Sequence, residues 1–232
     1  MKNNNILFIT GTDTGVGKTR VALAVLLALR SLKVDAHYFK PVQSGASARG
    51  GDAGAAMQLF PRGTSCIVPP LYSFPLAASP HLAARLSGIS IRPDKIAHEI
   101  RKQARNCDLL IVEGAGGLLV PLNGRETIAD LIQQIHANVV IVSRNKLGTL
   151  NHTALTLREA KRRRLTISGV VINNTSPART AADKLIRSDN LDALKSTSKE
   201  IRFVECPYSK SASKVWLIRF GKKIVKALKL NQ

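Results

Sequence analysis

Along the chain, short runs of apolar residues alternate with longer segments in which apolar residues recur every three or four positions. The short runs are typical of buried strands, and the longer segments are typical of helices with one buried face. In the first helical segment, for example, Val21, Val25 and Leu29 fall on one side. The pattern predicts strands at residues 6–10, 36–39, 109–112, 139–142, 167–172 and 201–204, and helices at 19–32, 93–105, 128–135, 150–164 and 215–228.

The predicted strands are apolar throughout rather than alternately apolar and polar. Strands of this kind, separated by helices, indicate an α/β fold with a mostly parallel sheet covered by helices on both faces. No internal repeat, low-complexity linker or sharp change in composition divides the chain, so residues 1–232 are predicted to form a single domain. Residues 46–91 are the least regular part and are rich in Gly, Pro and Ser, which is typical of functional loops.

The unusual segments of the sequence each follow a predicted strand. In chain order they are GTDTGVGKT, KPVQSG, VEGAGG, NKLGTLNH, INN and ECP. Parallel strands place their carboxyl ends at one edge of the sheet, and ligands of open α/β folds bind at that edge. The six segments should therefore meet there and form an active site.

The first of these segments has the composition of a phosphate-binding loop. Gly15 and Gly17 permit backbone conformations that turn N–H groups towards an anion, and a helix starting at Lys18 adds the positive end of its dipole. Lys18 would reach the terminal phosphates, and the Thr19 hydroxyl would bind Mg²⁺. Five residues separate Gly11 from Gly17, one more than in the usual loop. A structural glycine turn is the alternative, but a strand, this loop and the helix start together favour nucleotide binding.

Two further positions offer phosphate and metal chemistry. Lys40 ends the second predicted strand, and Pro41 after it favours an extended conformation that points off the sheet edge. Glu113 ends the third strand before four small residues, which let the backbone come close to a ligand. Because Mg²⁺ prefers hard oxygen ligands and bridges phosphates, Thr19, Asp52 and Glu113 are predicted to bind it. For Asp52, which follows two glycines in an irregular loop, an ordinary solvated side chain is the alternative.

Composition limits the function classes. The chain has three scattered cysteines without a CxxC pair, no apolar run of about 18 residues and no signal-peptide pattern. It is therefore expected in the cytoplasm, without membrane contact.

The formal net charge is +20, most of it in residues 156–232. A nucleic-acid-binding surface is one interpretation of this charge. A solvated basic face is favoured, and no nucleic acid partner is expected, because no aromatic residues that would stack bases are interleaved with the basic clusters.

Taken together, the motifs resemble those of the dethiobiotin synthetases, in which the longer phosphate loop is the family's own form. The resemblance is carried by LFITGTDTGVGKT, FKPVQSG, ASPHLAARLSG, LLIVEGAGGLLVPL, VSRNKLGTLNHTALT and GVVINN, in this order between residues 7 and 174. After Ser176 it fades to little more than ECP. It implies a P-loop NTPase-like fold and a ligase of biotin biosynthesis that uses ATP and Mg²⁺. The enzyme would close a ureido ring on 7,8-diaminononanoate with CO₂ or bicarbonate, giving dethiobiotin, ADP and phosphate.

The residues suit such a reaction on chemical grounds. A carbamate on one substrate amine is a poor electrophile, so phosphorylation of its oxygen, which gives a carbamic-phosphoric anhydride, creates a leaving group. The neighbouring amine then closes the ring. Phosphoryl transfer chiefly needs in-line positioning and positive charge around the γ-phosphate, which Lys18, Lys40 and a metal ion would supply. No Ser-His-Asp or Cys-His arrangement in the sequence points to a covalent enzyme intermediate.

The resemblance also implies roles for individual residues. Lys40 would be the catalytic lysine that touches carbamate and γ-phosphate, assisted by Lys18 and Thr14. Asn173 would hydrogen-bond adenine, with an Asn that merely ends a strand as the alternative. The implied nucleotide and metal set is Gly15, Val16, Gly17, Lys18, Thr19, Asp52, Glu113, Gly114, Ala115, Gly116, Asn173 and the backbone at Pro207. The implied substrate set is Ser44 and, from the neighbouring subunit of a homodimer, Gly148, Thr149, Leu150 and Asn151. The segment 79–81 also fits a helix cap with Pro at the first helical position, and it is left out of the site.

Two other classes of protein use similar phosphate chemistry. A partitioning-type ATPase would bind DNA through a basic surface, but it would carry a second Lys early in the loop, where this chain has Thr12 and Asp13. It would also carry an acidic motif in place of KPVQSG. A cobyrinate amidase-type ligase would add a glutaminase domain, for which 232 residues leave no room.

Overall fold

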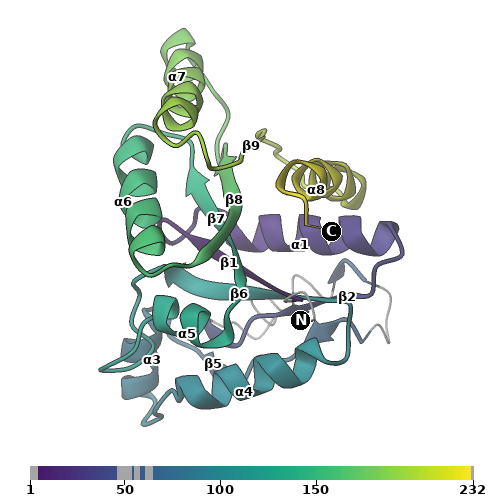
Figure 1. The fold of residues 1–232 in the computed structure, drawn as a ribbon, viewed down its shortest axis with the longest axis vertical. Helices are drawn as coiled ribbons and strands as arrows, with labels where there is room; N and C mark the ends of the chain where they lie inside the picture. Colours follow the sequence, from purple (N-terminus) through teal and green to yellow (C-terminus); the bar gives the residue numbers. More distant parts are fainter. Residues whose placement is uncertain (1–4, 46–53, 55–57, 61–64, 231–232) are drawn as a thin grey trace.

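A seven-stranded sheet forms the centre of the protein (Figure 1). The computed structural model describes residues 5–45, 54, 58–60 and 65–230. The strand order is β4-β2-β6-β1-β7-β8-β9, and every neighbouring pair is parallel. The strands are β1 (Ile6–Gly11), β2 (Ala36–Phe39), β4 (Ile67–Val68), β6 (Leu109–Gly117), β7 (Asn138–Arg144), β8 (Thr166–Asn173) and β9 (Phe203–Cys206). A separate parallel pair consists of β3 (Val42–Ser44) and β5 (Tyr72–Phe74).

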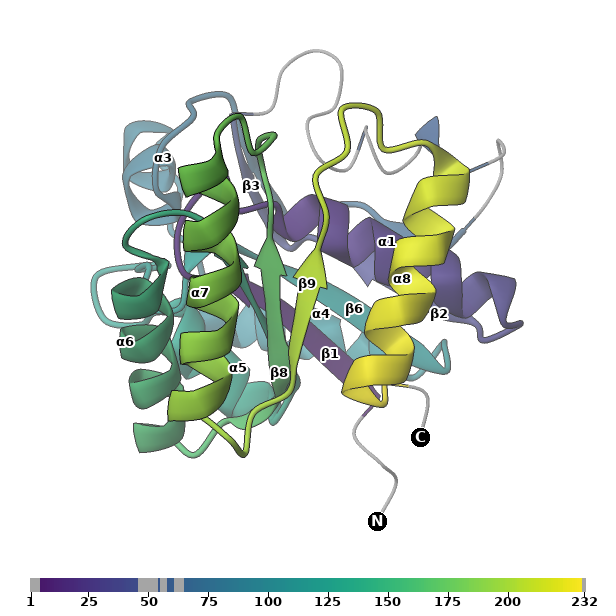
Figure 2. The ribbon, with the colours of Figure 1, turned by 90° about the horizontal axis from the view of Figure 1, so that it is seen from above.

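Helices cover both faces of the sheet, as the apolar strands predict. One face carries α1 (Lys18–Ser31) and α8 (Lys214–Leu228), which lie side by side (Figures 1 and 2). The other face carries α3 (Pro80–Leu86), α4 (Pro93–Ala104), α5 (Ile128–Ile135), α6 (Thr149–Arg162) and α7 (Ala181–Thr197). The predicted mostly parallel sheet with helices on both faces is therefore confirmed.

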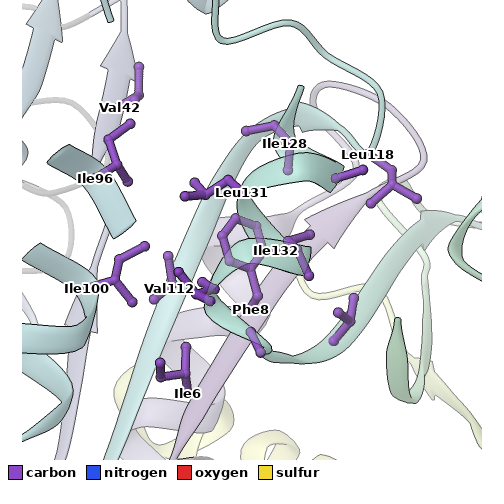
Figure 3. Close-up of a cluster of buried hydrophobic side chains, with 14 of the residues drawn as sticks. Ile6, Phe8, Val42, Ile96, Ile100, Val112, Leu118, Ile128, Leu131 and Ile132 are labelled. Atoms are coloured by element: carbon purple, nitrogen blue, oxygen red, sulfur yellow. The ribbon is translucent and has the colours of Figure 1, made fainter. Parts of the chain in front are cut away.

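Two hydrophobic cores lie on opposite faces of the sheet because side chains alternate along each strand. On β1, Ile6 and Phe8 pack with α4 and α5, as Figure 3 shows. Leu7 and Ile9 pack instead with α1 and α8. A strand that is buried on both sides has no polar alternation, which explains why the strands are apolar throughout the sequence.

Several elements differ from the prediction. Strand β9 starts at Phe203 rather than at residue 201, and β6 continues to Gly117 because its glycine-rich end still pairs with the end of β1. The sequence pattern did not predict β3, β4, β5 or α7, and of α3 it indicated only the N-terminal cap at residues 79–81. Helix α7 has only two buried residues, Asn190 and Leu194, so it lacks the apolar stripe that reveals a helix. Its start does carry a capping box of Thr180 and Asp183, a signal that was present but unused.

Two consequences of this architecture matter for function. The carboxyl ends of β1, β2, β6, β7 and β8 all lie at one edge of the sheet, where the glycine-rich and polar segments of the sequence begin. In the part of the chain that is described, none of the helices has the length and apolar character needed to span a membrane.

Candidate active site

The loop between β1 and α1 has the shape expected of an anion-binding turn. Gly15 and Gly17 adopt left-handed conformations, with φ of 69° and 98°. At Gly17 this conformation coincides with close packing, because a Cβ atom there would collide with the amide of Asn173. Helix α1 begins at Lys18 and has no acidic residue in its first turn. No carboxylate of that turn therefore neutralises the positive N-terminal end of the helix dipole. Lys18 is buried, and its Nζ donates to the carbonyl of Asp13 at 3.0 Å.

Glu113 lies at the centre of the site and joins three elements. Its Oε1 accepts hydrogen bonds from Thr19 Oγ1 at 2.8 Å and from Lys40 Nζ at 2.9 Å, the latter an ion pair. Its Oε2 accepts a hydrogen bond from the Tyr38 hydroxyl at 2.7 Å. The Glu113 carboxylate is buried, so these donors replace the water that a charged group would otherwise need. The predicted residues Thr19, Lys40 and Glu113 are thus brought together, and Tyr38 was missed.

This donor set fits a magnesium ion. Thr19 and Glu113 offer a hydroxyl and a carboxylate, both hard oxygen ligands, and the two groups lie within hydrogen-bond distance of each other. No group of three His, Cys, Asp or Glu side chains forms a metal cluster within the described ranges. A magnesium ion here would therefore depend on few protein ligands together with phosphate and water oxygens, which is its common mode of binding. Asp52, the third predicted ligand, lies outside the described residues.

A cavity of about 530 Å³ opens beside these side chains. This volume lies within the usual range for sites that bind small molecules. Its wall contains ten predicted site residues, namely Thr14, Gly15, Gly17, Lys18, Thr19, Lys40, Ser44, Glu113, Ala115 and Gly116. It also contains Ala77, Ala78, Ser79, Pro80 and Val120, which the prediction did not include.

Ser79 and Pro80 belong both to a helix cap and to the cavity wall. Pro80 is the first residue of α3, as the sequence predicted for this segment, and Ser79 is its N-cap. The Ser79 side chain makes no capping hydrogen bond to the helix. The sequence signal that could have placed this segment in the site was the motif ASPHLAARLSG, which contains Ser79 and Pro80 and is one of those that carry the family resemblance.

Asn173 lies at the end of β8 and contacts the phosphate loop. Its Nδ2 donates to the carbonyl of Val16 at 2.7 Å, so its Oδ1 must point the other way. This Oδ1 is buried and has no hydrogen-bond partner. A buried amide acceptor without a partner is costly, so it is suited to accept from the amino group of a ligand. Neither Asn173 nor Pro207, which follows β9 and is exposed, lines the cavity itself.

The predicted carboxylate-binding segment, residues 148–151, forms the start of α6. Gly148 is the N-cap, with φ of 90°, and Thr149 is the first residue of the helix. Leu150 and Asn151 are exposed. These four residues do not line the cavity of their own chain.

Strand β7 ties the start of α6 to the phosphate loop through buried hydroxyl groups. Ser143 Oγ accepts a hydrogen bond from Thr12 Oγ1 at 3.3 Å. It lies 2.9 Å from Thr149 Oγ1 and 2.8 Å from Thr153 Oγ1. The next residue, Arg144, donates from Nη2 to the carbonyl of Thr14 at 3.2 Å. The phosphate loop and α6 are therefore held in a defined mutual position by groups that are far apart in sequence.

The three cysteines lie outside the cavity. Burial raises the pKa of Cys66, raises that of Cys107 to about 11, and raises that of Cys206 to about 12. Thiols with such pKa values remain protonated at neutral pH and are weak nucleophiles. The site is thus built around phosphate and cation chemistry rather than around a thiolate.

Comparison with known proteins gives sequence matches over most of the chain. A family profile described as an AAA domain matches residues 5–214. The ATP-dependent dethiobiotin synthetase of Anaeromyxobacter sp. strain K is 45% identical over 176 residues, covering 74% of this chain and 77% of the relative. The synthetase of Cytophaga hutchinsonii is 42% identical, covering 72% and 75%. That of Anoxybacillus flavithermus is 40% identical, covering 73% and 78%.

Solved structures share the fold at low sequence identity. Cobyrinic acid a,c-diamide synthase from Mycobacterium smegmatis, with bound ADP and magnesium, has a TM-score of 0.58 at 14% identity, covering 99% of this chain and 97% of that chain. The pNOB8 ParA protein bound to nonspecific DNA has a TM-score of 0.57 at 10% identity, covering 98% and 99%. At these sequence identities, both matches show that the fold is shared.

Proposed function

Because the chain belongs to the ATP-dependent dethiobiotin synthetase family, whose members are ligases that form carbon–nitrogen bonds in biotin biosynthesis, we propose that it closes the ureido ring of dethiobiotin. The substrates are 7,8-diaminononanoate, CO₂ or bicarbonate, and ATP. The products are dethiobiotin, ADP and phosphate. The observation that carries the proposal is the convergence of Lys18, Thr19, Lys40 and Glu113 on one cavity at the sheet edge.

The proposed reaction has three steps. One substrate amine attacks CO₂ and loses a proton, which gives a carbamate. A carbamate oxygen then attacks the γ-phosphorus of ATP, so that ADP leaves and a carbamic-phosphoric anhydride forms. Finally, the second amine attacks the carbonyl carbon, phosphate leaves, and the ring closes with loss of the second amine's proton.

Positively charged groups of the chain stabilise the charge that moves in these steps. Lys18 and the N–H groups of the loop around Gly15 and Gly17 hold the phosphates, with Thr14 at the same wall. Lys40, directly after β2, approaches from the other side of Glu113 and faces the oxygen that accepts the phosphoryl group. Preorganised charge of this kind lowers the barrier because it needs no rearrangement as the transition state forms.

Magnesium binding is assigned to Thr19, Glu113 and Asp52. When bound, the ion neutralises phosphate charge and helps to orient the triphosphate. The contact of the buried Glu113 carboxylate with the Thr19 hydroxyl supports this assignment.

The remaining assignments concern the base, the substrate and the assembly. Asn173 accepts a hydrogen bond from the adenine amino group at its unpaired Oδ1. The backbone near Pro207 forms the opposite wall of the adenine site, and residues 114–116 lie beside the phosphates. Ser44 contacts the diamine end of the substrate from the cavity wall. Residues 148–151 bind the substrate carboxylate in the neighbouring subunit of a homodimer, at a helix start suited to an anion. We also propose that residues 1–232 form one catalytic domain that works in the cytoplasm, where ATP is available.

The decisive experiment is direct detection of the product. Purified protein is incubated with diaminononanoate, ¹³C-bicarbonate, Mg²⁺ and ATP, and dethiobiotin with one added mass unit is measured by mass spectrometry. Glu113→Gln is the matched control, because it keeps the shape of the side chain but removes the charge, and it should lose most Mg²⁺-dependent turnover. If no dethiobiotin forms and DNA instead stimulates ATP hydrolysis, a partitioning-type ATPase is the correct assignment.

A further inference from the structure

Tyr38 contacts the centre of the site but has no part in the reaction proposed above. We propose that Tyr38 is a positioning residue, whose hydroxyl holds Oε2 of Glu113 so that Oε1 stays directed towards Thr19 and the cation position. The inference rests on the proposed function, in which Glu113 and Thr19 bind Mg²⁺. By this inference, Tyr38 sets the orientation in which the Glu113 carboxylate binds the ion.

The register of the sheet explains how Tyr38 reaches Glu113. Strand β2 lies parallel to β6, with Tyr38 opposite Ile111 and Phe39 opposite Val112. Ile111 and Glu113 are two residues apart on β6 and therefore point to the same face of the sheet, which is the face that Tyr38 shares. Lys40, the residue after the end of β2, reaches the same carboxylate. A tyrosine two positions before the lysine thus approaches the carboxylate from the side opposite the phosphate loop.

The two oxygens of Glu113 have separate partners. Oε2 accepts from the Tyr38 hydroxyl at 2.7 Å, whereas Oε1 accepts from Thr19 and Lys40. The last torsion of a glutamate side chain is broad, so packing alone does not set the direction of its oxygens. Anchoring Oε2 removes this freedom, because rotation of the carboxylate would break the bond. Tyr38 is fully buried, so water cannot take over a lost bond there without a rearrangement.

Charge explains why a tyrosine is suited to this role. A divalent cation bound at Oε1 would repel the ammonium of Lys40, which lies 2.9 Å from the same oxygen. The neutral hydroxyl of Tyr38 on Oε2 would feel no such repulsion. Tyr38 is therefore a donor that can hold Glu113 in the same orientation with and without the metal ion. Removal of a hydrogen-bond partner that orients a metal-binding carboxylate commonly lowers the metal affinity by roughly 10- to 100-fold.

The test compares Tyr38→Phe with Tyr72→Phe. Tyr38→Phe removes one hydroxyl and keeps the ring. Tyr72→Phe is a matched control, because its hydroxyl accepts from the Arg92 amide at 3.2 Å and does not line the cavity. Mn²⁺, used in place of Mg²⁺, is titrated in the presence of a non-hydrolysable ATP analogue, and free Mn²⁺ is measured by electron paramagnetic resonance. We expect the Mn²⁺ Kd to rise roughly tenfold or more in Tyr38→Phe and to stay at the wild-type value in Tyr72→Phe.

Two companion measurements separate positioning from a purely structural role. In the turnover assay, the Mg²⁺ concentration for half-maximal rate should rise in parallel with the Mn²⁺ Kd, while saturating Mg²⁺ restores most of kcat. Thermal unfolding of each variant is measured without metal. A lower Tm for Tyr38→Phe together with an unchanged Mn²⁺ Kd would mean that the hydroxyl only stabilises the fold, and the inference would be wrong.

The same data distinguish this inference from the proposed function. If the wild-type protein binds no Mn²⁺ with the nucleotide analogue, the metal site at Glu113 is wrong and the Tyr38 role is refuted with it. If the wild-type protein binds Mn²⁺ but makes no dethiobiotin, the reaction is wrong, and the Mn²⁺ Kd of Tyr38→Phe still decides the role of Tyr38.

Discussion

At the residue scale, the two lysines of the cavity have different partners although both are buried. Lys18 belongs to the phosphate loop, where its Nζ donates to the carbonyl of Asp13. Lys40 directly follows β2 and forms an ion pair with Glu113. Because their elements approach the cavity from different sides, the two charges should act at different stages of the reaction.

We therefore expect different effects from Lys18→Ala and Lys40→Ala. Lys18→Ala should weaken ATP binding as well as turnover, because the phosphate loop binds the nucleotide in its ground state. Lys40→Ala should lower kcat by about 10²-fold or more, the scale of losing one preorganised contact to developing charge. It should leave nucleotide affinity close to the wild-type value, since contacts made only in the transition state affect rate rather than binding.

Calorimetric titration with an ATP analogue, performed beside steady-state kinetics, measures both quantities. A loss of nucleotide affinity in Lys40→Ala that matches its loss of rate would make Lys40 a ground-state phosphate anchor. In that case the catalytic assignment would have to be abandoned.

At the element scale, the position of α6 depends on charged contacts with α5 and within α6 itself. Arg163, just after α6, forms ion pairs with Asp130 of α5 and with Glu159 of α6. Asp130 is itself held in a capping box with Thr127 at the start of α5. These contacts lie at the end of α6 opposite to residues 148–151, so they help to set the direction of the helix that carries the proposed carboxylate site.

Glu159 should make this arrangement sensitive to acid. Hydrogen bonds from Arg162 and Arg163 lower the pKa of Glu159 to about 2, compared with an ordinary value of 4.5. Because the folded-state pKa is below the unfolded one, the stabilisation is present above about pH 4.5 and is lost as the pH falls towards 2. Glu159→Gln should therefore have a lower Tm than wild type at pH 7, and the difference should shrink between pH 4.5 and pH 2.

Thermal unfolding of the two proteins across this pH range checks the prediction. A Tm difference that is the same at pH 7 and pH 2.5 would show that Glu159 contributes through packing rather than through its charge. The same series in 1 M salt serves as a control, because screening should reduce the effect of exposed ion pairs.

At the scale of the whole molecule, exposed apolar side chains gather around the start of α6 and the loop after β6. They are Leu119, Leu147, Leu150 and Leu155, of which Leu147 is 82% exposed. Residues 148–151 lie among them but do not line the cavity of their own chain. Both features agree with a homodimer in which each subunit completes the site of the other.

Mixed dimers give a sharp test of this arrangement. Light scattering should first report about twice the chain mass of 25.1 kDa. Lys40→Ala and Asn151→Ala are then prepared separately, each with little activity, and mixed under conditions that exchange subunits. If residue 151 serves the neighbouring site, half of the dimers are mixed and each has one site without either defect, so activity returns to about a quarter of wild type.

Activity that stays at the sum of the two parent variants would mean that residue 151 acts in its own subunit. An active monomer would refute the shared site altogether. Mixing Lys40→Ala with Lys18→Ala is the matched control, because both of these residues line the same cavity and each mixed dimer then has a defect in both sites.

The sequence alone was enough to predict the parallel sheet, the principal helices and the edge at which the site forms. These features follow from short-range patterns: apolar runs, helical spacing, and the glycines and Lys18-Thr19 that close the first loop. The motifs were also enough to identify the family. For Lys40 and Glu113, position at a strand end predicted proximity, and the structure brings them within 2.9 Å.

Only the tertiary structure decided which side chains share a partner. Tyr38 reads in the sequence as one more apolar position in a buried strand. Its contact with Glu113, 75 residues away in the chain, depends on the pairing of β2 with β6. Ser79 reads as an ordinary cap until the fold places it in the cavity wall. Helix α7 is mostly exposed and carries no apolar stripe. In each case the decisive contact is long-range or weak, and a local pattern records neither the strand register nor the packing that creates it.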